Sequence, residues 1–237
     1  LVIENRRAVA VNFKHHGQQR MARANAEIIL SAGAIGSPQI LQLSGIGDGK
    51  MLSDAGIQPL HELTGVGKNL QDHLQIRTIF KVRNVTTLND MIHSLGGKMR
   101  IGLEYMINRS GPMSMAPSQL GAFIKSDRAI ETPDLQYHVQ PLSLDRFGTP
   151  LHRFSAFTAS VCNLRPHSRG YVAIRSADPT EHPVIKPNYL STDHDRLVAA
   201  NSIRLTRDIV SQQALAPFQP EEYLPGGDFL SDSELAE

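Results

Sequence analysis

Residues 33–47 read Gly-Ala-Ile-Gly-Ser-Pro-Gln-Ile-Leu-Gln-Leu-Ser-Gly-Ile-Gly, and this stretch decides which fold the chain is expected to adopt. The apolar, β-branched run at 27–31 comes just before it and favours a buried strand. Ser37-Pro38 is typical of a helix start, because serine caps helices and proline has no amide to leave unpaired. A short helix over 39–44, closed by Gly45, is therefore expected.

The glycines of this stretch also suggest a function. Gly33 and Gly36 would let the backbone approach a ligand closely. Exposed amides at a helix start favour an anion such as a diphosphate. A plain strand–turn–helix connection explains the same residues, and on physical grounds alone it is the simpler interpretation.

The first third of the chain contains further short elements. Strand-like runs at 1–3, 8–13 and 20–24 are separated by turn-forming residues and predict an antiparallel ribbon. The sequence also predicts a second short helix over 50–55, ended by Gly56, and a strand over 74–82.

The rest of the chain, after residue 82, contains both helical and strand-like patterns. Asn89 is expected to cap a long helix in which apolar residues recur at steps of three and four, namely Ile92, Leu95, Met99, Leu103 and Met106. Asp193 is expected to cap another helix that runs to about Gln213, with Leu197, Val198, Asn201, Leu205 and Ile209 along one side. Strand-like runs fall at 122–125, 135–139, 154–164 and 170–175. Their connections are too short for helical crossovers, so the fold class is α+β with a mainly antiparallel sheet flanked by helices.

Composition excludes several classes of protein. The 237 residues carry a net charge of +1 without long charged runs, which argues against a nucleic-acid surface or a polybasic membrane patch. No uninterrupted apolar stretch approaches the roughly 20 residues that span a bilayer. The single cysteine, Cys162, excludes an intrachain disulfide and favours a reducing compartment, so a cytoplasmic location is expected.

Simple catalytic and metal-binding motifs are absent from the sequence. It contains no Gly-x-Ser-x-Gly elbow, no phosphate loop and no complete Gly-x-Gly-x-x-Gly, so a serine hydrolase has no motif in its favour. The histidines lack a metal-ligand spacing, and no metal site is expected. Cys162 lies in a predicted strand and is expected to be a small buried side chain rather than a nucleophile.

Three stretches resemble one family, the glucose–methanol–choline (GMC) flavoprotein oxidoreductases. Residues 33–47, with 27–32 before them, resemble its second signature position by position. Residues 65–73 (Gly-Val-Gly-Lys-Asn-Leu-Gln-Asp-His) are similar to its Gly-x-Gly-x-Asn-Leu-Gln-Asp-His element, and residues 166–170 (Pro-His-Ser-Arg-Gly) to its Pro-x-Ser-Arg-Gly strand entry. Order and spacing agree over nearly the whole chain, and the choline-dehydrogenase-like branch is most similar.

The resemblance implies an FAD enzyme that oxidises a primary alcohol, with a base taking the hydroxyl proton while a hydride passes to the flavin. It also implies a partial FAD-binding domain over 1–80 and a substrate-binding domain over 81–237. The cofactor-binding residues implied are Ala32, Gly33, Ala34, Ile35, Ser37, Pro38, Asn69, Asp72 and His73. For Asp72 and His73, a hydrogen-bonded turn that holds two segments together is an equal alternative.

Two family features have no counterpart in this sequence. The dinucleotide-binding glycine motif would lie before residue 1, and the catalytic histidine would lie after Glu237, so no catalytic residue is assigned. A Ser231–Glu234 capping box predicts a helix start just before the end, so we expect an internal piece of a longer protein. Because both family features are missing, we expect this piece to be inactive alone and to hold FAD poorly or not at all.

The partners implied are a small alcohol and the missing parts of its own chain. Nucleic acid is not expected, and self-association is left open. Choline recognition would need aromatic faces and a carboxylate. The chain has 8 Phe, 5 Tyr and no Trp, which favours an uncharged aliphatic or aromatic alcohol. The alternative function is a non-catalytic binding domain that keeps the substrate-domain fold.

Overall fold

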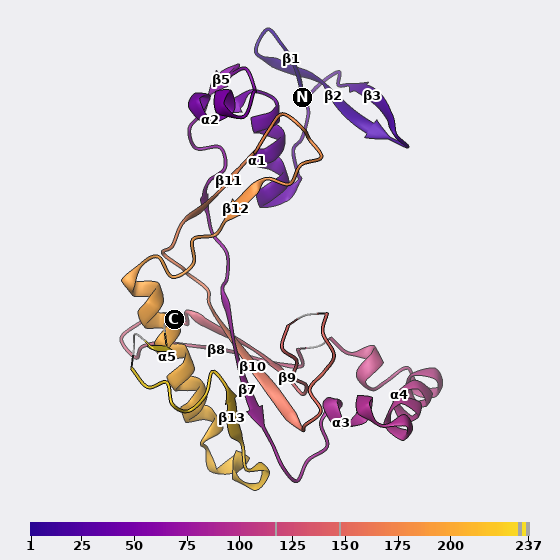
Figure 1. The fold of residues 1–237 in the computed structure, drawn as a ribbon, viewed down its shortest axis with the longest axis vertical. Coiled ribbons are helices and arrows are strands. Elements are labelled where there is room, and N and C mark those ends of the chain that lie inside the picture. Colours follow the sequence, from indigo (N-terminus) through magenta and orange to yellow (C-terminus); the bar gives the residue numbers. More distant parts are fainter. Residues whose placement is uncertain (117, 147, 232–233, 236–237) are drawn as a thin grey trace. The chain divides into compact units, whose positions relative to one another are not determined.

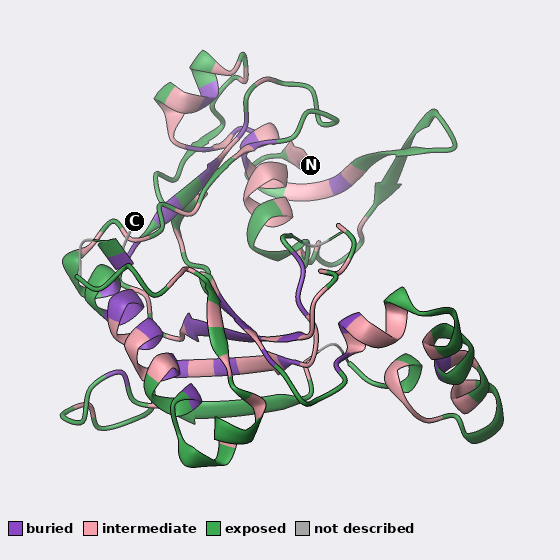
Figure 2. Cartoon of the chain, turned by 60° about the horizontal axis from the view of Figure 1, so that its bottom comes forward, coloured by how far each residue is buried: buried purple, intermediate pink, exposed green. Residues whose placement is uncertain are grey.

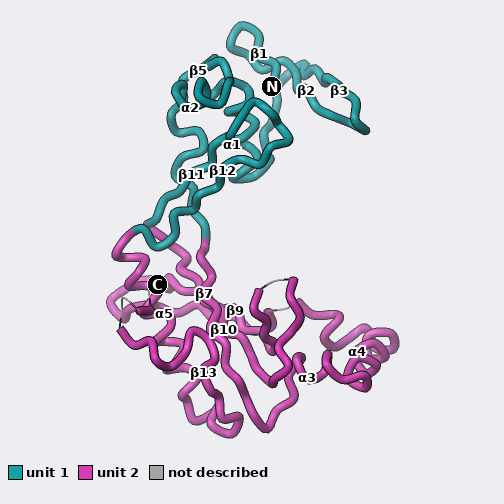
Figure 3. Tube along the Cα trace, viewed as in Figure 1, with its two compact units in different colours: residues 1–72, 168–191 teal, residues 73–167, 192–237 magenta. Residues whose placement is uncertain are grey.

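The computed structural model describes residues 1–116, 118–146, 148–231 and 234–235. It divides the chain into two compact units, shown in different colours in Figure 3. Unit 1 comprises 1–72 and 168–191, and unit 2 comprises 73–167 and 192–237. The predicted division at residue 80 concerns cofactor and substrate roles and stays a prediction. The compact units show that residues distant in sequence, 168–191, fold with the first 72.

Unit 1 begins with the predicted antiparallel ribbon, which the structure confirms. Its strands are β1 (Val2–Glu4), β2 (Arg7–His15) and β3 (Gln18–Arg23), in the order β1-β2-β3. His16 and Gly17 form the turn between β2 and β3 with φ of 47° and 80°. Two positive φ angles are what a two-residue turn needs to match the twist of an antiparallel pair.

The helix of the 33–47 stretch begins earlier than predicted. Helix α1 covers Gly33–Leu43, so the expected start at Ser37-Pro38 was wrong and Pro38 lies inside the helix. A proline there removes one backbone hydrogen bond. The Ser37 hydroxyl instead accepts a hydrogen bond from the Ala32 amide at 3.1 Å, a contact that sequence spacing does not reveal.

The end of α1 and the next helix agree with prediction. Gly45 follows the helix with a φ of +79°, and a Cβ there would lie 2.7 Å from the Gln58 carbonyl oxygen. Helix α2 (Gly49–Asp54) is capped by Asp48, whose carboxylate accepts from the Met51 amide at 3.0 Å. The short strands β4 (Ile46–Gly47) and β5 (His61–Glu62) pair in parallel beside it.

The buried strand predicted over 27–31 was wrong. These residues have no regular secondary structure, and the Ile29 side chain is 76% exposed. An apolar run becomes a strand only where a neighbouring strand pairs with its backbone. Among the described residues no strand pairs with this run.

A three-stranded sheet completes unit 1, in the order β12-β11-β6. The strands are β6 (Lys68–Leu70), β11 (Gly170–Ala173) and β12 (Val184–Lys186). Gly170 pairs with Leu70, and a Cβ on Gly170 would lie 2.0 Å from the Lys186 carbonyl oxygen. Only glycine therefore allows these strands to approach so closely.

Unit 2 is built on a five-stranded antiparallel sheet, which confirms the α+β prediction. Its strands, in spatial order, are β13 (Glu221–Leu224), β7 (Gln75–Lys81), β10 (Ala156–Asn163), β9 (Leu135–Gln140) and β8 (Leu120–Ile124). Helix α5 (Asp193–Val210) lies along one face of this sheet (Figure 1). Leu135, Tyr137 and Val161 from the sheet form the core with Val198 of α5.

Helix α5 agrees with prediction in length but not in its buried side. Thr192, rather than Asp193, is the N-cap, and its hydroxyl accepts from the Asp195 amide at 3.2 Å. Val198 is buried as expected, but Leu197 and Ile209 are 49% and 45% exposed. The buried side also contains Ile203 and Val210, together with small and polar residues that a pattern of large apolar side chains does not predict, namely Ala199, Ala200, Ser202 and Thr206.

The long helix predicted from Asn89 is two helices. The helix α3 (Leu88–His93) is capped by Thr87, and α4 (Leu95–Asn108) by Ser94, whose hydroxyl accepts from the Gly97 amide at 2.9 Å. A short 3₁₀ helix, η1 (Pro112–Ser114), follows α4, and another, η2 (Gln213–Phe218), follows α5. Asn89 is fully buried and donates to the Ser143 hydroxyl at 2.9 Å instead of capping.

The capping box near the end of the chain is confirmed. The Ser231 hydroxyl donates to the Glu234 carboxylate at 2.7 Å, and the Ser231 amide donates to the same carboxylate at 2.9 Å. These hydrogen bonds lower the pKa of Glu234. Leu235 joins a small apolar cluster with Ala200 and Ile203 of α5.

Candidate cofactor site

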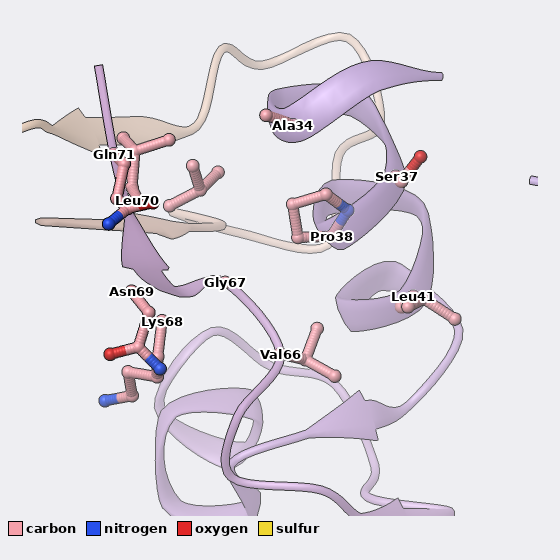
Figure 4. A pocket seen from close by; sticks show the side chains of 11 residues that line it. Ala34, Ser37, Pro38, Leu41, Val66, Gly67, Lys68, Asn69, Leu70 and Gln71 are labelled. Atoms are coloured by element: carbon pink, nitrogen blue, oxygen red, sulfur yellow. The ribbon is translucent and has the colours of Figure 1, made fainter. Parts of the chain in front are cut away.

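Unit 1 contains a cavity of about 420 Å³ between α1 and β6. Ala34 and Pro38 of α1 face the strand that carries Lys68, Asn69 and Leu70 (Figure 4). The full lining is Ala34, Ser37, Pro38, Leu41, Val66, Gly67, Lys68, Asn69, Leu70, Gln71 and Val172. Two of the three stretches quoted above, 33–47 and 65–73, thus form its walls, and β11 closes it.

Gln42 holds the three segments of this cavity together. Its side chain is fully buried, and its amide group donates to the carbonyl oxygens of Val66 at 3.3 Å and Val172 at 3.0 Å. Its side-chain oxygen accepts from the Ile174 amide at 2.9 Å. A buried polar side chain with all of these partners fixes the distance between α1 and the strands. Sequence reasoning missed Gln42, because nothing in its spacing separates it from the half-buried Gln39 on the same helix.

The backbone around residue 67 is also adapted to close packing. Gly67 has a φ of +79°, and a Cβ there would lie 2.1 Å from the Val172 carbonyl oxygen and 2.5 Å from the Gln42 amide nitrogen. Asn69 has a left-handed φ of 58°, which asparagine tolerates better than most residues. These two positive φ angles direct the backbone of residues 67–71 along one wall of the cavity.

The electrostatic character of the cavity suits an anionic ligand. Lys68 is the charged residue of its lining, which includes no carboxylate. The first turn of α1 has no side-chain cap, since Ala32 occupies the N-cap position. Its amides therefore remain available to an anion, favoured further by the helix dipole. The cavity volume lies in the range of small-molecule sites, so these residues fit part of a nucleotide cofactor.

The structure brings together some of the residues that sequence reasoning selected for cofactor binding. Ala34, Ser37, Pro38 and Asn69 line the cavity. Ala32, Gly33 and Ile35 belong to the start of the same helix but not to the lining, and neither do Asp72 and His73. A cofactor-binding role for all nine residues stays a prediction.

Asp72 and His73 take part in local hydrogen bonds. The Tyr189 hydroxyl donates to the Asp72 carboxylate, and this bond, with burial and the carboxylate charge, raises the pKa of Tyr189 to about 12. The His73 Nε2 lies 3.2 Å from the Leu164 carbonyl oxygen. These contacts match the alternative in which both residues hold chain segments together.

The third stretch, 166–170, meets the second through Gln71 and Arg169. With the Gln71 amide oriented to suit its neighbours, its oxygen accepts from the Arg169 Nε at 3.0 Å. Ser168 is buried, and its hydroxyl accepts from the Ser191 amide at 3.0 Å. Ser168 and Arg169 thus each hold a neighbouring segment just before β11 begins at Gly170.

One group in unit 2 resembles a serine–histidine–aspartate arrangement. The two ring nitrogens of His152 lie 3.0 Å from the Ser143 hydroxyl and 3.0 Å from the Asp145 carboxylate. Ser143, however, is fully buried, and its hydroxyl also accepts from the Asn89 amide. A substrate cannot reach it, so this network stabilises the loop before β10.

Cys162 is 3% exposed, and burial raises the pKa of its thiol, which confirms the predicted buried side chain. Among the residues that the structure describes, no cluster of His, Cys, Asp or Glu could hold a metal ion.

Comparison with known proteins identifies the class to which this fold and site belong. The GMC oxidoreductase N-terminal family model matches residues 1–75, and the C-terminal model matches residues 166–236. The chain belongs to the GMC oxidoreductase family.

Among the curated relatives that this chain resembles are choline dehydrogenases. The mitochondrial choline dehydrogenase of Homo sapiens is 40% identical over 99% of this chain and 39% of its own length. The oxygen-dependent choline dehydrogenase of Vibrio vulnificus is 40% identical over 99% of this chain and 42% of its own length. The chain therefore spans about two fifths of the length of these curated relatives.

Solved structures show the same fold. Formate oxidase of Aspergillus oryzae, described for its FAD modification, has a TM-score of 0.88 at 25% identity and covers 100% of this chain and 46% of its own. Pyridoxine 4-oxidase from Mesorbium loti has a TM-score of 0.80 at 24% identity, covering 99% of this chain and 42% of its own.

Among the residues that the structure describes, no helix is both long enough and apolar enough to cross a membrane.

Proposed function

We propose that this chain supplies one wall of the FAD site and the substrate-domain sheet of an enzyme that oxidises a primary alcohol to an aldehyde. The observation that carries the proposal is the cavity of unit 1, where α1, the 66–71 segment and β11 meet around the buried Gln42. Membership in the GMC oxidoreductase family, the named choline dehydrogenase relatives and the FAD of formate oxidase support it.

The residues of this chain would bind and orient the cofactor. The uncapped first turn of α1 and the Lys68 ammonium group would stabilise its negative charge. Pro38, Leu41 and Val66 would exclude water from the apolar side of the cavity. Bound FAD supplies a hydride acceptor for the alcohol. No residue of this chain is assigned as the base that removes the hydroxyl proton.

The choice of alcohol has two candidates. The relatives are named choline dehydrogenases, which favours choline. The chain itself has no tryptophan and only 13 other aromatic residues, 8 Phe and 5 Tyr, which favours an uncharged alcohol because a trimethylammonium group binds best to aromatic faces. We propose a primary alcohol as the substrate class, so the experiment must compare choline with benzyl and aliphatic alcohols.

The test is the visible spectrum of the gene product that contains these residues, recorded without oxygen before and after each alcohol is added. Flavin bands that bleach with a primary alcohol support the proposal and identify the preferred substrate. A protein that stays colourless after FAD is supplied contradicts it and favours the non-catalytic binding domain instead. The cytoplasmic location expected from Cys162 also stays a prediction.

A further inference from the structure

Unit 2 contains a second cavity, which lies between helix α5 and the five-stranded sheet. Its volume is about 520 Å³, within the range of sites that hold small molecules. Its walls come from strands β8, β9 and β10, helix α5, the 3₁₀ helix η2 and the segment 82–87. Its lining includes Tyr137, Phe157, Ala159, Thr206, Ile209 and Phe218. It is called the unit 2 cavity below.

The unit 2 cavity lies on the face of the sheet that α5 covers. Val139 of β9 and Ala159 of β10 are opposite each other in the register, and both line the cavity. Tyr137 and Val161 form the next pair on the same face and belong to one core cluster with Val198 of α5. Helix α5 carries buried residues on one side and exposed residues on the other (Figure 2). The unit 2 cavity shares no lining residue with the cavity of unit 1, so it is a separate site.

The lining of the unit 2 cavity is uncharged. Its residues, all of which the structure describes, include no Lys, Arg, Asp, Glu or His. Four of them are polar, namely Thr86, Thr87, Gln119 and Thr206, and the rest are apolar or aromatic. Moving a charge from water into such a site without a partner is costly. A ligand that fits this cavity is therefore neutral.

The buried hydroxyl groups of the lining are already paired within the protein. The hydroxyl oxygens of Tyr137 and Thr206 lie 2.8 Å apart, and both residues are buried. Thr206 also donates to the Ser202 carbonyl at 2.7 Å, and the Thr87 hydroxyl donates to the Asp90 carboxylate at 2.8 Å. Because these groups do not need water, the cavity is suited to apolar molecules instead.

The aromatic rings of the lining favour a flat aromatic ligand. They belong to Tyr137, Phe157 and Phe218. The Phe157 ring stacks on Phe80 with ring centroids 5.4 Å apart, which holds it in place. Aromatic pairs contribute more than the area that they bury, because the edges and faces of rings attract one another. Gln119 is an exposed lining residue, and its amide group can donate to one acceptor atom of a ligand.

A segment of polypeptide fits this cavity less well than a small molecule does. An extended segment would bring backbone N–H and C=O groups that need hydrogen-bond partners. Two of the four polar lining residues, Thr87 and Thr206, are already paired. Two side chains therefore remain to meet such groups, those of Thr86 and Gln119. One turn of α-helix, about 10–12 Å across and about 5.4 Å long, would by itself take up the whole volume.

We propose that the unit 2 cavity is a binding site for a neutral aromatic small molecule. The ligand would lie between the sheet and α5, with its rings against Phe157 and Phe218 and an acceptor atom toward Gln119. The proposal rests on unit 2 alone and is independent of the proposed oxidoreductase activity.

The test compares two compounds that have nearly the same shape but differ in charge. The compound 2-acetylnaphthalene is neutral and carries a carbonyl acceptor, whereas 2-naphthoate carries a carboxylate on the same two rings. Equilibrium dialysis against the gene product that contains these residues measures the dissociation constant of each compound. We expect the neutral compound to bind at least about tenfold more tightly, because no residue of the lining is positively charged.

Two substitutions on α5 locate the bound compound. Ile209→Asp places a charge in the wall of the unit 2 cavity, and Leu197→Asp places the same charge outside the lining. Both residues are nearly half exposed, so neither substitution puts a charge into the core. We expect Ile209→Asp to weaken the binding of 2-acetylnaphthalene at least about tenfold and Leu197→Asp to leave it unchanged.

Failure of the unmodified protein to bind 2-acetylnaphthalene overturns the proposal, and so does equally tight binding of the two compounds. Equal affinity of the two variants for 2-acetylnaphthalene would place the compound elsewhere in the protein and would overturn it as well. Sedimentation tests whether a second copy covers the cavity. A dimer that Ile209→Asp separates and Leu197→Asp leaves intact would assign the cavity to an interface between copies, and the proposal would then be wrong.

Discussion

Gln42 shows how one side chain can organise a site that it does not line. It lies on α1, yet its partners are Val66, Val172 and Ile174, two of which lie on segments far along the chain. Because all of its hydrogen bonds are buried, replacing it leaves donors and acceptors without water or protein partners. The geometry of the cavity therefore depends on Gln42 as much as on the residues of its wall.

Gln42→Leu should reduce the free energy of unfolding by about 2–4 kcal/mol, since the Ile174 amide and two carbonyl groups lose their partner. Chemical denaturation measures this change. Gln39→Leu is the matched control on the same helix, because Gln39 makes one exposed hydrogen bond to the Glu181 carbonyl. Its cost should stay below about 0.5 kcal/mol. Equal costs for both variants would show that Gln42 has no special role.

The Tyr189–Asp72 pair predicts a dependence of stability on alkaline pH. The pKa of Tyr189 is raised to about 12 in the fold, against about 10 in an unfolded chain. The pair therefore stabilises the fold fully below pH 10, and this contribution is lost as pH rises through 12. Tyr189→Phe should remove that part of the pH dependence. Ultraviolet titration of tyrosinate should show one tyrosine fewer ionising near pH 12, and Asp72→Asn should return Tyr189 toward its ordinary pKa.

At the scale of elements, adjacent glycines on α4 have opposite roles. A Cβ on Gly97 would meet the Met91 carbonyl oxygen at 2.1 Å, whereas one on Gly96 would meet nothing within 4 Å. The sequence alone does not distinguish these two glycines. The structure shows that Gly97 permits the contact between two helices.

Gly97→Ala should destabilise the α3–α4 hairpin by about 1–3 kcal/mol, because the helices must separate to admit the methyl group. Gly96→Ala should instead raise stability by about 0.5–1 kcal/mol through the higher helix propensity of alanine. Thermal unfolding followed by circular dichroism compares the two variants. A gain in stability for Gly97→Ala would contradict the close contact of α3 with α4.

The elements that sequence patterns predicted well depend on local signals. The glycines after α1 and α2, and the strand-like runs that form β7 and β9, could be recognised without knowledge of distant residues. The wrong predictions concern segments whose secondary structure or burial is decided by tertiary contacts. The apolar run at 27–31 lacks a pairing strand, and the periodic stripe of α4 faces outward. The walls of the cavity were predictable from residues 33–38 and 69, but Gln42 and Val172 were not, because their role exists only once the chain has folded.

At the scale of the whole molecule, the two compact units contain different functional features. Unit 1 contains the candidate cofactor cavity, whose lining residues all lie within 1–72 and 168–191. Unit 2 contains the five-stranded antiparallel sheet and helix α5, and Figure 3 shows the two units in different colours. The family assignment covers parts of both, and the chain spans about two fifths of its curated relatives.

The 237 residues alone should therefore hold FAD poorly. The sequence has no complete Gly-x-Gly-x-x-Gly motif, and the cavity of about 420 Å³ offers room for only part of such a cofactor. Gel filtration after incubation with FAD should separate protein from flavin. Stoichiometric retention of the yellow colour would show that this prediction is wrong.

The most direct test of the central claim is the flavin content of the gene product that contains this chain. Ala34→Trp would fill the cavity, and Gln39→Trp on the same helix lies outside its lining. We expect about one FAD per polypeptide for the unmodified protein and for Gln39→Trp, and less than about a tenth of that for Ala34→Trp. Full flavin content in Ala34→Trp, or none in the unmodified protein after FAD is supplied, would contradict the claim that this cavity forms part of an FAD site.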